Sequence, residues 1–192
     1  MKKFFSLVLL CLILSFFAKA QNTQTKSKSK VETSTAQLGI KAGVNISNIQ
    51  VGGNDNAYDS RAGFHIGALA HIHISDHFAV QPELMYSSQG VETSTKEYNE
   101  NFINLPLLLQ YMTMDGFRLQ TGPQVGFLVS AKEKTGDVEI DFKDLLNKVD
   151  FSWAFGASYL SKIGLGLDVR YNLGISNRTK NDNSPETRYR VW

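Results

Sequence analysis

The sequence predicts an all-β fold: an eight-stranded antiparallel up-and-down transmembrane β-barrel whose eighth strand is short or truncated. Three observations lead to this prediction. Seven segments alternate apolar and polar residues with a period of two, which indicates strands with different surroundings on their two faces. Their connections alternate between long polar loops and turns of two to four residues. Aromatic residues gather at both ends of the apolar faces, where membrane barrels carry interfacial girdles.

The first 36 residues precede the predicted barrel. Residues 1–20 have the form of a secretory signal peptide, with Lys2 and Lys3 before an apolar run and small residues at the cleavage site. A retained membrane anchor is the alternative, although the apolar run is short for a membrane helix. Residues 21–36 have almost nothing to bury, so they are predicted to be a disordered polar tail. The barrel domain is expected over residues 37–192.

Charge and cysteine content narrow the function classes. The whole chain carries a net charge of +2, and removal of residues 1–20 leaves 17 basic and 18 acidic residues. This balance gives no support to nucleic-acid binding. The single cysteine, Cys11, lies in the predicted signal peptide, so the rest of the chain has no thiol for disulfide or thiolate chemistry.

The clearest strand pair covers residues 102–112 and 117–130. One of its faces is mainly apolar or aromatic from Ile103 to Val129, and the other carries the charged residue, the amides and the glycines. The same alternation recurs at residues 38–47, 61–74, 78–88, 151–159 and 163–175, and a last short stretch covers residues 187–192. The seven apolar faces contain no charged residue. Long polar loops are expected at residues 89–101 and 131–150, with a helical turn at 142–147.

The content of the apolar faces decides which side of the barrel looks inward. A soluble ligand-binding barrel has its apolar face inside, but eight strands enclose a lumen only just wide enough for side chains. So many aromatic rings fit more easily on a lipid-facing exterior. Strand edges in lipid must also meet, because unpaired backbone groups are costly there. We therefore expect a barrel in the cell outer membrane, with short periplasmic turns and long external loops.

Four phrases of the sequence resemble the PorT-type porin family of Bacteroidota, which are small outer-membrane barrels. They are QPELMYSSQG at 81–90, INLPLLLQY at 103–111, GFRLQTGPQVGFLVS at 116–130 and GLGLDVRYNLG at 164–174, in the family's order. The resemblance implies a non-enzymatic protein with a structural or interaction role, supporting secretion or adhesion through its external loops. The implied partners are outer-membrane lipids and lipopolysaccharide, the outer-membrane assembly machinery, and secretion or surface proteins.

Two features of the strands are interpreted with the help of this resemblance. Pro82, Pro106 and Pro123 lie within strands, where proline removes a ladder donor. Family members carry prolines at these places, so these segments are still predicted to be strands, with a local bulge at each proline. Family barrels also end in a full strand with a terminal aromatic residue, whereas residues 187–192 are too few to span a membrane. We expect the chain to stop within strand 8 and to leave the seam between strands 1 and 8 incomplete; Trp192 as the terminal aromatic of a shortened strand is the alternative.

Five charged residues are predicted to point into the lumen, and eight aromatic residues are predicted to form the girdles. The predicted lumen polar network comprises Lys41, Glu83, Arg118, Asp168 and Arg170. The predicted aromatic girdle comprises Phe78, Tyr86, Tyr111, Phe117, Phe127, Trp153, Tyr159 and Tyr171. The network can be a salt-bridged plug, since buried charges must be paired, or a polar conduit. The plug is the favoured interpretation, and Asp168 and Arg170 are its expected partners.

Other chemistry has weaker support in the sequence. His71 and His73 project from one side of a strand, but no acidic residue or cysteine completes a metal site at a suitable spacing. No nucleophile elbow or catalytic carboxylate pair is recognisable. We therefore predict no enzyme activity, no metal and no cofactor. The alternative function is a narrow gated channel for ions or small solutes.

Overall fold

The computed structural model describes residues 36–52, 58–93, 95–113, 115–136, 138–179 and 187–192. The predicted signal peptide and the predicted tail up to residue 35 lie outside the described residues. The described chain forms β1 (Ala36–Val51), β2 (Asp59–His73), β3 (Phe78–Glu92), β4 (Glu97–Met112), β5 (Phe117–Thr135), β6 (Val138–Asp141), the 3-10 helix η1 (Lys143–Leu145), β7 (Val149–Leu160), β8 (Gly166–Gly174) and β9 (Thr187–Val191). Among the described residues, no helix is long and apolar enough to cross a membrane.

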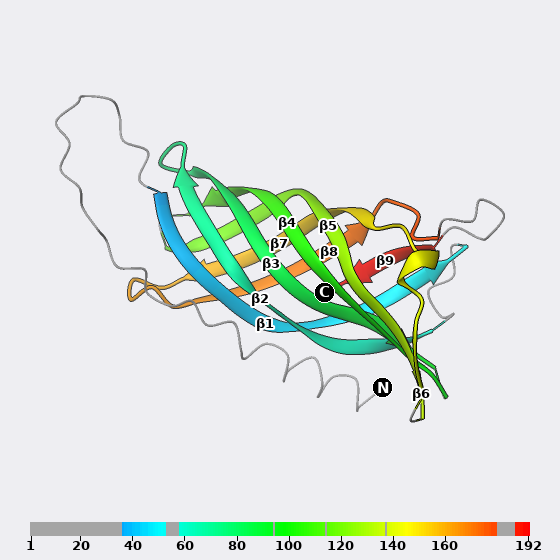
Figure 1. Cartoon of the computed structure of the whole chain (residues 1–192). Coiled ribbons are helices and arrows are strands. Elements are labelled where there is room, and N and C mark those ends of the chain that lie inside the picture. The colour runs from blue at the N-terminus through cyan, green and yellow to red at the C-terminus, as the bar shows by residue number, and fades with distance from the viewer. Residues whose placement is uncertain (1–35, 53–57, 94, 114, 137, 180–186) are drawn as a thin grey trace.

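Eight of these strands form the wall of an antiparallel barrel, which confirms the predicted fold class (Figure 1). Each wall strand pairs with the next one along the chain, and β9 closes the ring by pairing with both β1 and β8. The ninth strand, β6, was not predicted. It continues the ladder along β5 beyond Phe127, the last residue of β5 that pairs with β7.

Side chains alternate across the wall as the sequence predicts. Leu119 on the outer face of β5 is 51% exposed, whereas its neighbour Gln120 is 4% exposed. The same alternation leaves leucine, isoleucine, valine and phenylalanine side chains exposed on every wall strand from β1 to β8. We call this outward surface the apolar belt. Because the belt surrounds a polar interior, the structure has the arrangement of a membrane barrel.

The strands are longer than predicted at the long-loop end. Residues 89–101, predicted as a loop, belong mostly to β3 and β4, which pair as far as Glu92 and Glu97. Residues 131–135 likewise continue β5, and residues 138–141 form β6. The prediction failed because both faces of these segments carry polar residues, so the apolar period ends although the backbone pairing continues. The predicted helical turn is confirmed as η1.

The prolines do not produce the predicted bulges. Pairing around Pro82, Pro106 and Pro123 has the same register before and after each proline, although some ladder pairs are missing there. The register shifts lie elsewhere, between Ser60 and His65 and between Asn101 and Phe102. Proline therefore removes local hydrogen bonds, while the pairs on either side hold the register.

The barrel seam between β1 and β8 is closed only in part by backbone pairing. β9 pairs with residues 47–51 of β1 and with Asn172 and Leu173 of β8. Ile46 and Trp192 add two backbone hydrogen bonds of 2.6 and 2.9 Å. Among the described residues, no strand pairs with the seam edge of β1 over residues 36–45 or of β8 over residues 166–171. The predicted incomplete seam is thus present.

Candidate functional site

Four charged side chains meet in the lumen at mid-wall. The guanidinium group of Arg170 donates two hydrogen bonds of 2.8 Å to the two carboxylate oxygens of Glu83. Lys41 Nζ lies 2.6 Å from Asp168 Oδ1 and 3.9 Å from Glu83 Oε1. We call these four residues the lumen network. Its two cations and two anions balance, as buried charges must.

Glutamine side chains complete the lumen network. Gln81 donates a 2.8 Å hydrogen bond to Glu83, and Gln120 donates one of 2.5 Å to Asp168. Gln110 in turn donates to Gln120 over 2.9 Å. All three glutamines are buried at inward positions of β3, β4 and β5. The network therefore connects most of the barrel wall across the lumen.

The structure adds two details that the sequence did not specify. Arg118 is not among the charged side chains that meet at mid-wall; it lies nearer the short turn, paired with Ser158 of β7 and Met112 of β4. Asp168 and Arg170 are 3.7 Å apart at their charged ends, but each makes its shorter ion pair with another residue, Lys41 or Glu83. The stagger of neighbouring strands, which is the shear of the barrel, explains the position of Arg118 and the choice of ion-pair partners. It determines which residues face each other across the lumen.

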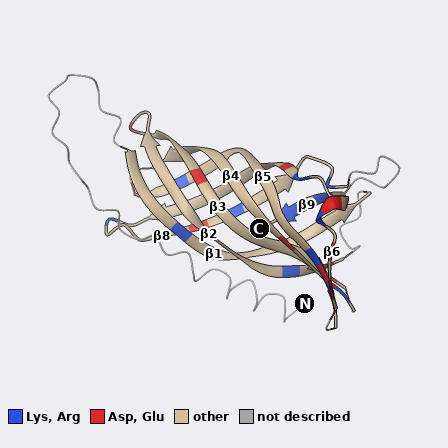
Figure 2. Cartoon of the chain, in the orientation of Figure 1, with Lys and Arg blue, Asp and Glu red and all other residues tan. Residues whose placement is uncertain are grey.

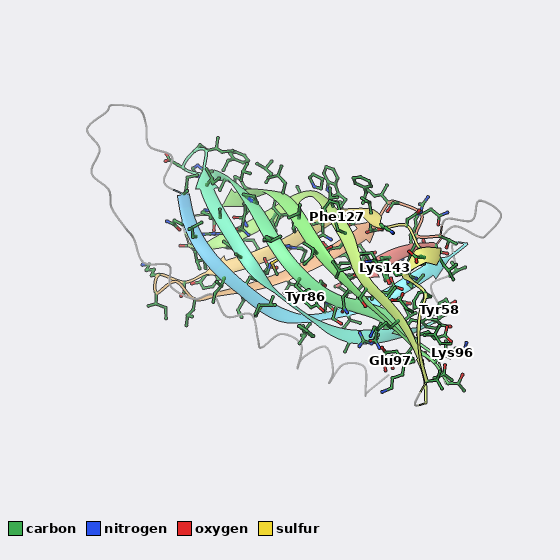
Figure 3. All side chains as sticks on the ribbon, viewed as in Figure 1. Tyr58, Tyr86, Lys96, Glu97, Phe127 and Lys143 are labelled. Atoms are coloured by element: carbon green, nitrogen blue, oxygen red, sulfur yellow. The ribbon has the colours of Figure 1, made fainter. Side chains whose placement is uncertain are left out.

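The predicted girdle residues occupy the two ends of the apolar belt. At the short-turn end, Phe78 contacts Tyr111 with ring centroids 5.4 Å apart, and Phe117 lies opposite Tyr159. At the long-loop end, Tyr86 packs on Phe64 and Tyr171 on Trp192. Phe127 on β5 also points outward in this half of the belt (Figure 3). Trp153 on β7 is exposed as well. The assignment of these rings to membrane interfaces remains our proposal.

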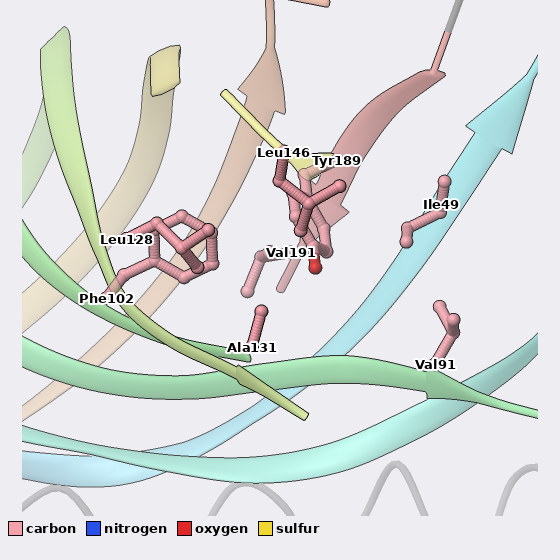
Figure 4. Close-up of a cluster of buried hydrophobic side chains, with 8 residues drawn as sticks. All are labelled: Ile49, Val91, Phe102, Leu128, Ala131, Leu146, Tyr189 and Val191. Carbon is pink, nitrogen blue, oxygen red and sulfur yellow. The ribbon is translucent and has the colours of Figure 1, made fainter. Parts of the chain in front are cut away.

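An apolar cluster lies inside the barrel below the long loops, and the sequence analysis did not predict it. It comprises Ile49, Val91, Phe102, Leu128, Ala131, Leu146, Tyr189 and Val191 (Figure 4). We call it the apolar cap. Its members come from β1, β3, β4, β5 and β9 and from the segment just after η1. Phe102 lies two residues before the inward Asn104, so the alternation indicates that Phe102 also points inward. Residues 89–101 are predicted as a loop, and the apolar cap is therefore not recognisable from the preceding segment.

A buried carboxylate, that of Glu100, forms polar contacts beside the apolar cap. Glu100 is fully buried, forms an ion pair with Arg178, and accepts a 2.5 Å hydrogen bond from the hydroxyl of Tyr189. The guanidinium carbon of Arg178 also lies 4.8 Å from the centre of the Tyr189 ring. Asn147 donates to the carbonyl of Asn177 and thereby ties the segment after η1 to the segment after β8. These contacts hold both segments over the lumen.

Beyond the apolar belt, the wall continues as a charged sheet formed by residues 89–93, 95–101, 131–136 and 138–141, which we call the outer extension. Figure 2 shows acidic and basic residues gathered there, and Figure 3 labels Lys96 and Glu97 at its tip. Lys96 lies 2.6 Å from Glu133, and this hydrogen bond raises the pKa of Lys96. Arg61 donates a 2.9 Å hydrogen bond to Glu97, which lowers the pKa of that carboxyl.

The outer extension also exposes apolar side chains. All four residues of β6 are exposed, among them Val138 and Ile140, and Leu145 in η1 is 69% exposed. The only described strand that pairs with β6 is β5. This edge therefore presents free backbone groups and apolar side chains outside the apolar belt, a combination typical of protein contact surfaces.

A cavity of about 280 Å³ separates the lumen network from the apolar cap. Lys41, Asp168 and Arg170 line one side of it, and Val191 of the cap lines another. His65 also lines the cavity, whereas His71 and His73 lie nearer the short turns with ring centroids 4.6 Å apart. In the described part of the chain, no three histidine, cysteine or acidic residues are grouped to hold a metal ion.

Comparisons with known proteins agree with this architecture. A family model described as "Outer membrane protein beta-barrel domain" matches residues 19–180. Among solved structures, Neisserial surface protein A is 13% identical, covers 82% of this chain and 94% of its own, and superposes with a TM-score of 0.59. The attachment invasion locus protein Ail of Yersinia pestis is 14% identical, with coverages of 83% and 95% and a TM-score of 0.48. No curated protein matches the sequence.

Proposed function

The chain belongs to the outer membrane protein β-barrel domain family, and from this premise we propose that it is a non-enzymatic outer-membrane protein with a structural or interaction role. Its wall anchors the molecule among outer-membrane lipids and lipopolysaccharide, after insertion by the outer-membrane assembly machinery. Its long-loop end contacts surface or secretion proteins. This is the PorT-like role that the sequence resemblance implies.

The observation that carries this proposal is that paired charges and apolar side chains lie across the lumen at two levels. A solute crossing the barrel meets the lumen network at mid-wall and the apolar cap below the long loops. Passage requires separation of buried ion pairs, and a buried charge that loses its partner costs about 3–5 kcal/mol. It also requires displacement of Arg178 from Glu100. A protein built in this way is better suited to present a surface than to conduct.

The outer extension supports an interaction role and suggests its form. Among the described residues, no strand pairs with the second edge of β6, which carries Val138 and Ile140 on one face and Glu139 and Asp141 on the other. An extended segment of a partner protein can add to such an edge, with backbone hydrogen bonds for affinity and side-chain contacts for specificity. We therefore assign the contact to a partner strand that brings apolar residues to Val138 and Ile140.

Planar-bilayer recording tests the structural role against the channel alternative. The refolded protein is expected to give no stepwise conductance, while a general porin added afterwards to the same bilayer shows that channels are detectable. Reproducible conductance steps from the protein alone would contradict the proposal and favour a narrow gated channel.

Site-specific photocrosslinking on intact cells tests the interaction role. A photoreactive residue at Leu145, beside β6, is expected to give a discrete protein adduct, whereas the same residue at lipid-facing Leu84 gives none. Replacement of Val138 and Ile140 by threonine should remove the adduct, because the substitution keeps strand propensity and removes apolar contact. An adduct that persists in this variant, or the absence of any adduct at Leu145, would contradict the assignment.

A further inference from the structure

The face of the outer extension that turns away from the apolar cap, which we call its outer face, changes sign from strand to strand. Lys134 of β5 lies opposite Glu97 of β4 and Glu139 of β6. Lys132 of β5 forms an ion pair with Glu139 and lies opposite Asp141 of β6. Residues directly opposite each other in an antiparallel pair share one face of the sheet. The outer face is therefore acidic on β4, basic on β5 and acidic again on β6.

The acidic charge of β6 is only partly compensated by described residues. Glu139 shares its ion pair with Lys132, but Asp141 forms no ion pair with any described residue. Asp141 Oδ1 accepts a 2.9 Å hydrogen bond from the backbone N–H of Lys143. The ammonium group of Lys143 lies elsewhere, because it donates to the carbonyl of Val129 over 2.9 Å. The edge of β6 thus presents negative charge on the outer face.

The opposite face of β6 is apolar. Val138 and Ile140 are 60% and 56% exposed. Ile140 lies opposite Glu133 of β5, and that carboxylate is already paired with Lys96 at 2.6 Å. A strand added to the edge of β6 therefore meets aliphatic side chains on one face and carboxylates on the other.

A second copy of this chain does not fit this edge. Antiparallel pairing of two β6 strands would place Glu139 opposite Asp141 or opposite the other copy's Glu139, since facing residues share one face. Like charges directly opposite each other destabilise a strand pair. A strand with basic residues at these positions continues the alternation of charge that begins on β4.

We propose that the partner strand of β6 is an extended segment in which basic and aliphatic residues alternate. Lysine or arginine lies opposite Glu139 and Asp141, and aliphatic residues lie opposite Val138 and Ile140. This inference rests on the proposed function, which places a partner strand at β6, and it adds the charge that the partner must carry. Backbone hydrogen bonds at an edge suit any extended segment, whereas complementary charges discriminate between segments.

Peptide binding to the refolded full chain in phosphatidylcholine vesicles tests this preference. One fluorescent peptide with blocked ends alternates lysine with valine, and its counterpart carries glutamate in place of each lysine. Fluorescence anisotropy measures the dissociation constant of each peptide. Vesicles without protein give the binding of each peptide to lipid alone, which is subtracted.

The lysine peptide is expected to bind roughly tenfold more tightly than the glutamate peptide, because opposite charges replace like charges at two cross-strand positions. Added salt should reduce this ratio, since exposed charges are screened. Lys132→Glu combined with Glu139→Lys keeps an ion pair within the protein but removes the net negative charge of β6, so it should abolish the preference. Lys96→Glu combined with Glu133→Lys is the matched control on the opposite face and should leave the preference unchanged.

The outcomes separate this inference from the strand contact itself. Equal binding of the two peptides, weakened by combined Val138→Thr and Ile140→Thr, would overturn the basic preference and leave the contact at β6 in place. Tighter binding of the glutamate peptide would also overturn the preference, as would a preference that survives the charge exchange between residues 132 and 139. Absence of binding by both peptides, or binding that the threonine substitutions do not weaken, would overturn the contact at β6 as well.

Discussion

At the scale of single residues, the four charged side chains of the lumen network depend on one another. Arg170 donates two hydrogen bonds to Glu83, and Lys41 forms its shorter ion pair with Asp168. Which side chains face each other across the lumen depends on the stagger of the strands. Lys41 and Asp168 are 127 positions apart in the sequence and meet across an incompletely paired seam.

Substitution of Lys41 should therefore destabilise the barrel strongly. Lys41→Met leaves Asp168 with its more distant partner Arg170, and the loss of one member of a buried ion pair costs about 3–5 kcal/mol. Urea unfolding of the protein refolded into vesicles measures the free energy of unfolding. The exposed Lys162→Met is the matched control and should change it by less than about 0.5 kcal/mol. Equal stability of the two variants would show that the pair across the seam is not structural.

At the scale of elements, the sequence located the seven long wall strands and the short last strand, but it placed several strand ends too early. Its apolar signal ends where the belt ends, whereas β3, β4 and β5 continue into the outer extension. Pairing there is supported by ion pairs such as Arg61 with Glu97 and Lys96 with Glu133. β6 and the apolar cap were missed for the same reason, since both lie where the alternating pattern stops.

The pairing of β3 and β4 in the outer extension should weaken in acid. The hydrogen bond from Arg61 lowers the pKa of Glu97 below its usual value of 4.5 in the folded state. Its contribution to stability is therefore complete above about pH 4.5 and is lost as the pH falls through the lower folded-state pKa.

Amide hydrogen exchange at Val91 and Tyr98, which pair in this ladder, measures the effect. Because Glu97 is partly exposed, we expect only a roughly two- to fivefold fall in protection, after correction for the intrinsic pH dependence of exchange. Glu97→Gln should give low protection throughout, with no step in this range. A step of the same size in Glu97→Gln would assign the effect to another carboxyl group, such as Glu92 near Arg61.

At the scale of the whole molecule, the structure is a membrane barrel with an apolar exterior, a charged network at mid-wall and an apolar cap under the long loops. The composition of the two strand faces was sufficient to predict which side looks outward. The sequence predicted charged residues in the lumen but not the apolar cap. The apolar cap brings together five strands and one loop segment that are distant in the sequence. This arrangement supports our proposal that the protein is anchored in the outer membrane and presents its long-loop end to partners.

The most direct test of this account is a nitroxide scan along β5 in reconstituted vesicles. Single cysteines at 119, 120, 121, 124 and 125, in a background with Cys11 replaced by serine, carry the label. We predict frequent collisions with membrane-dissolved oxygen at 119, 121 and 125, and few at 120 and 124, where the native glutamines are 4% and 7% exposed. Preferential collision of labels at 119, 121 and 125 with a water-soluble nickel complex, or loss of the alternation, would contradict a lipid-facing apolar belt.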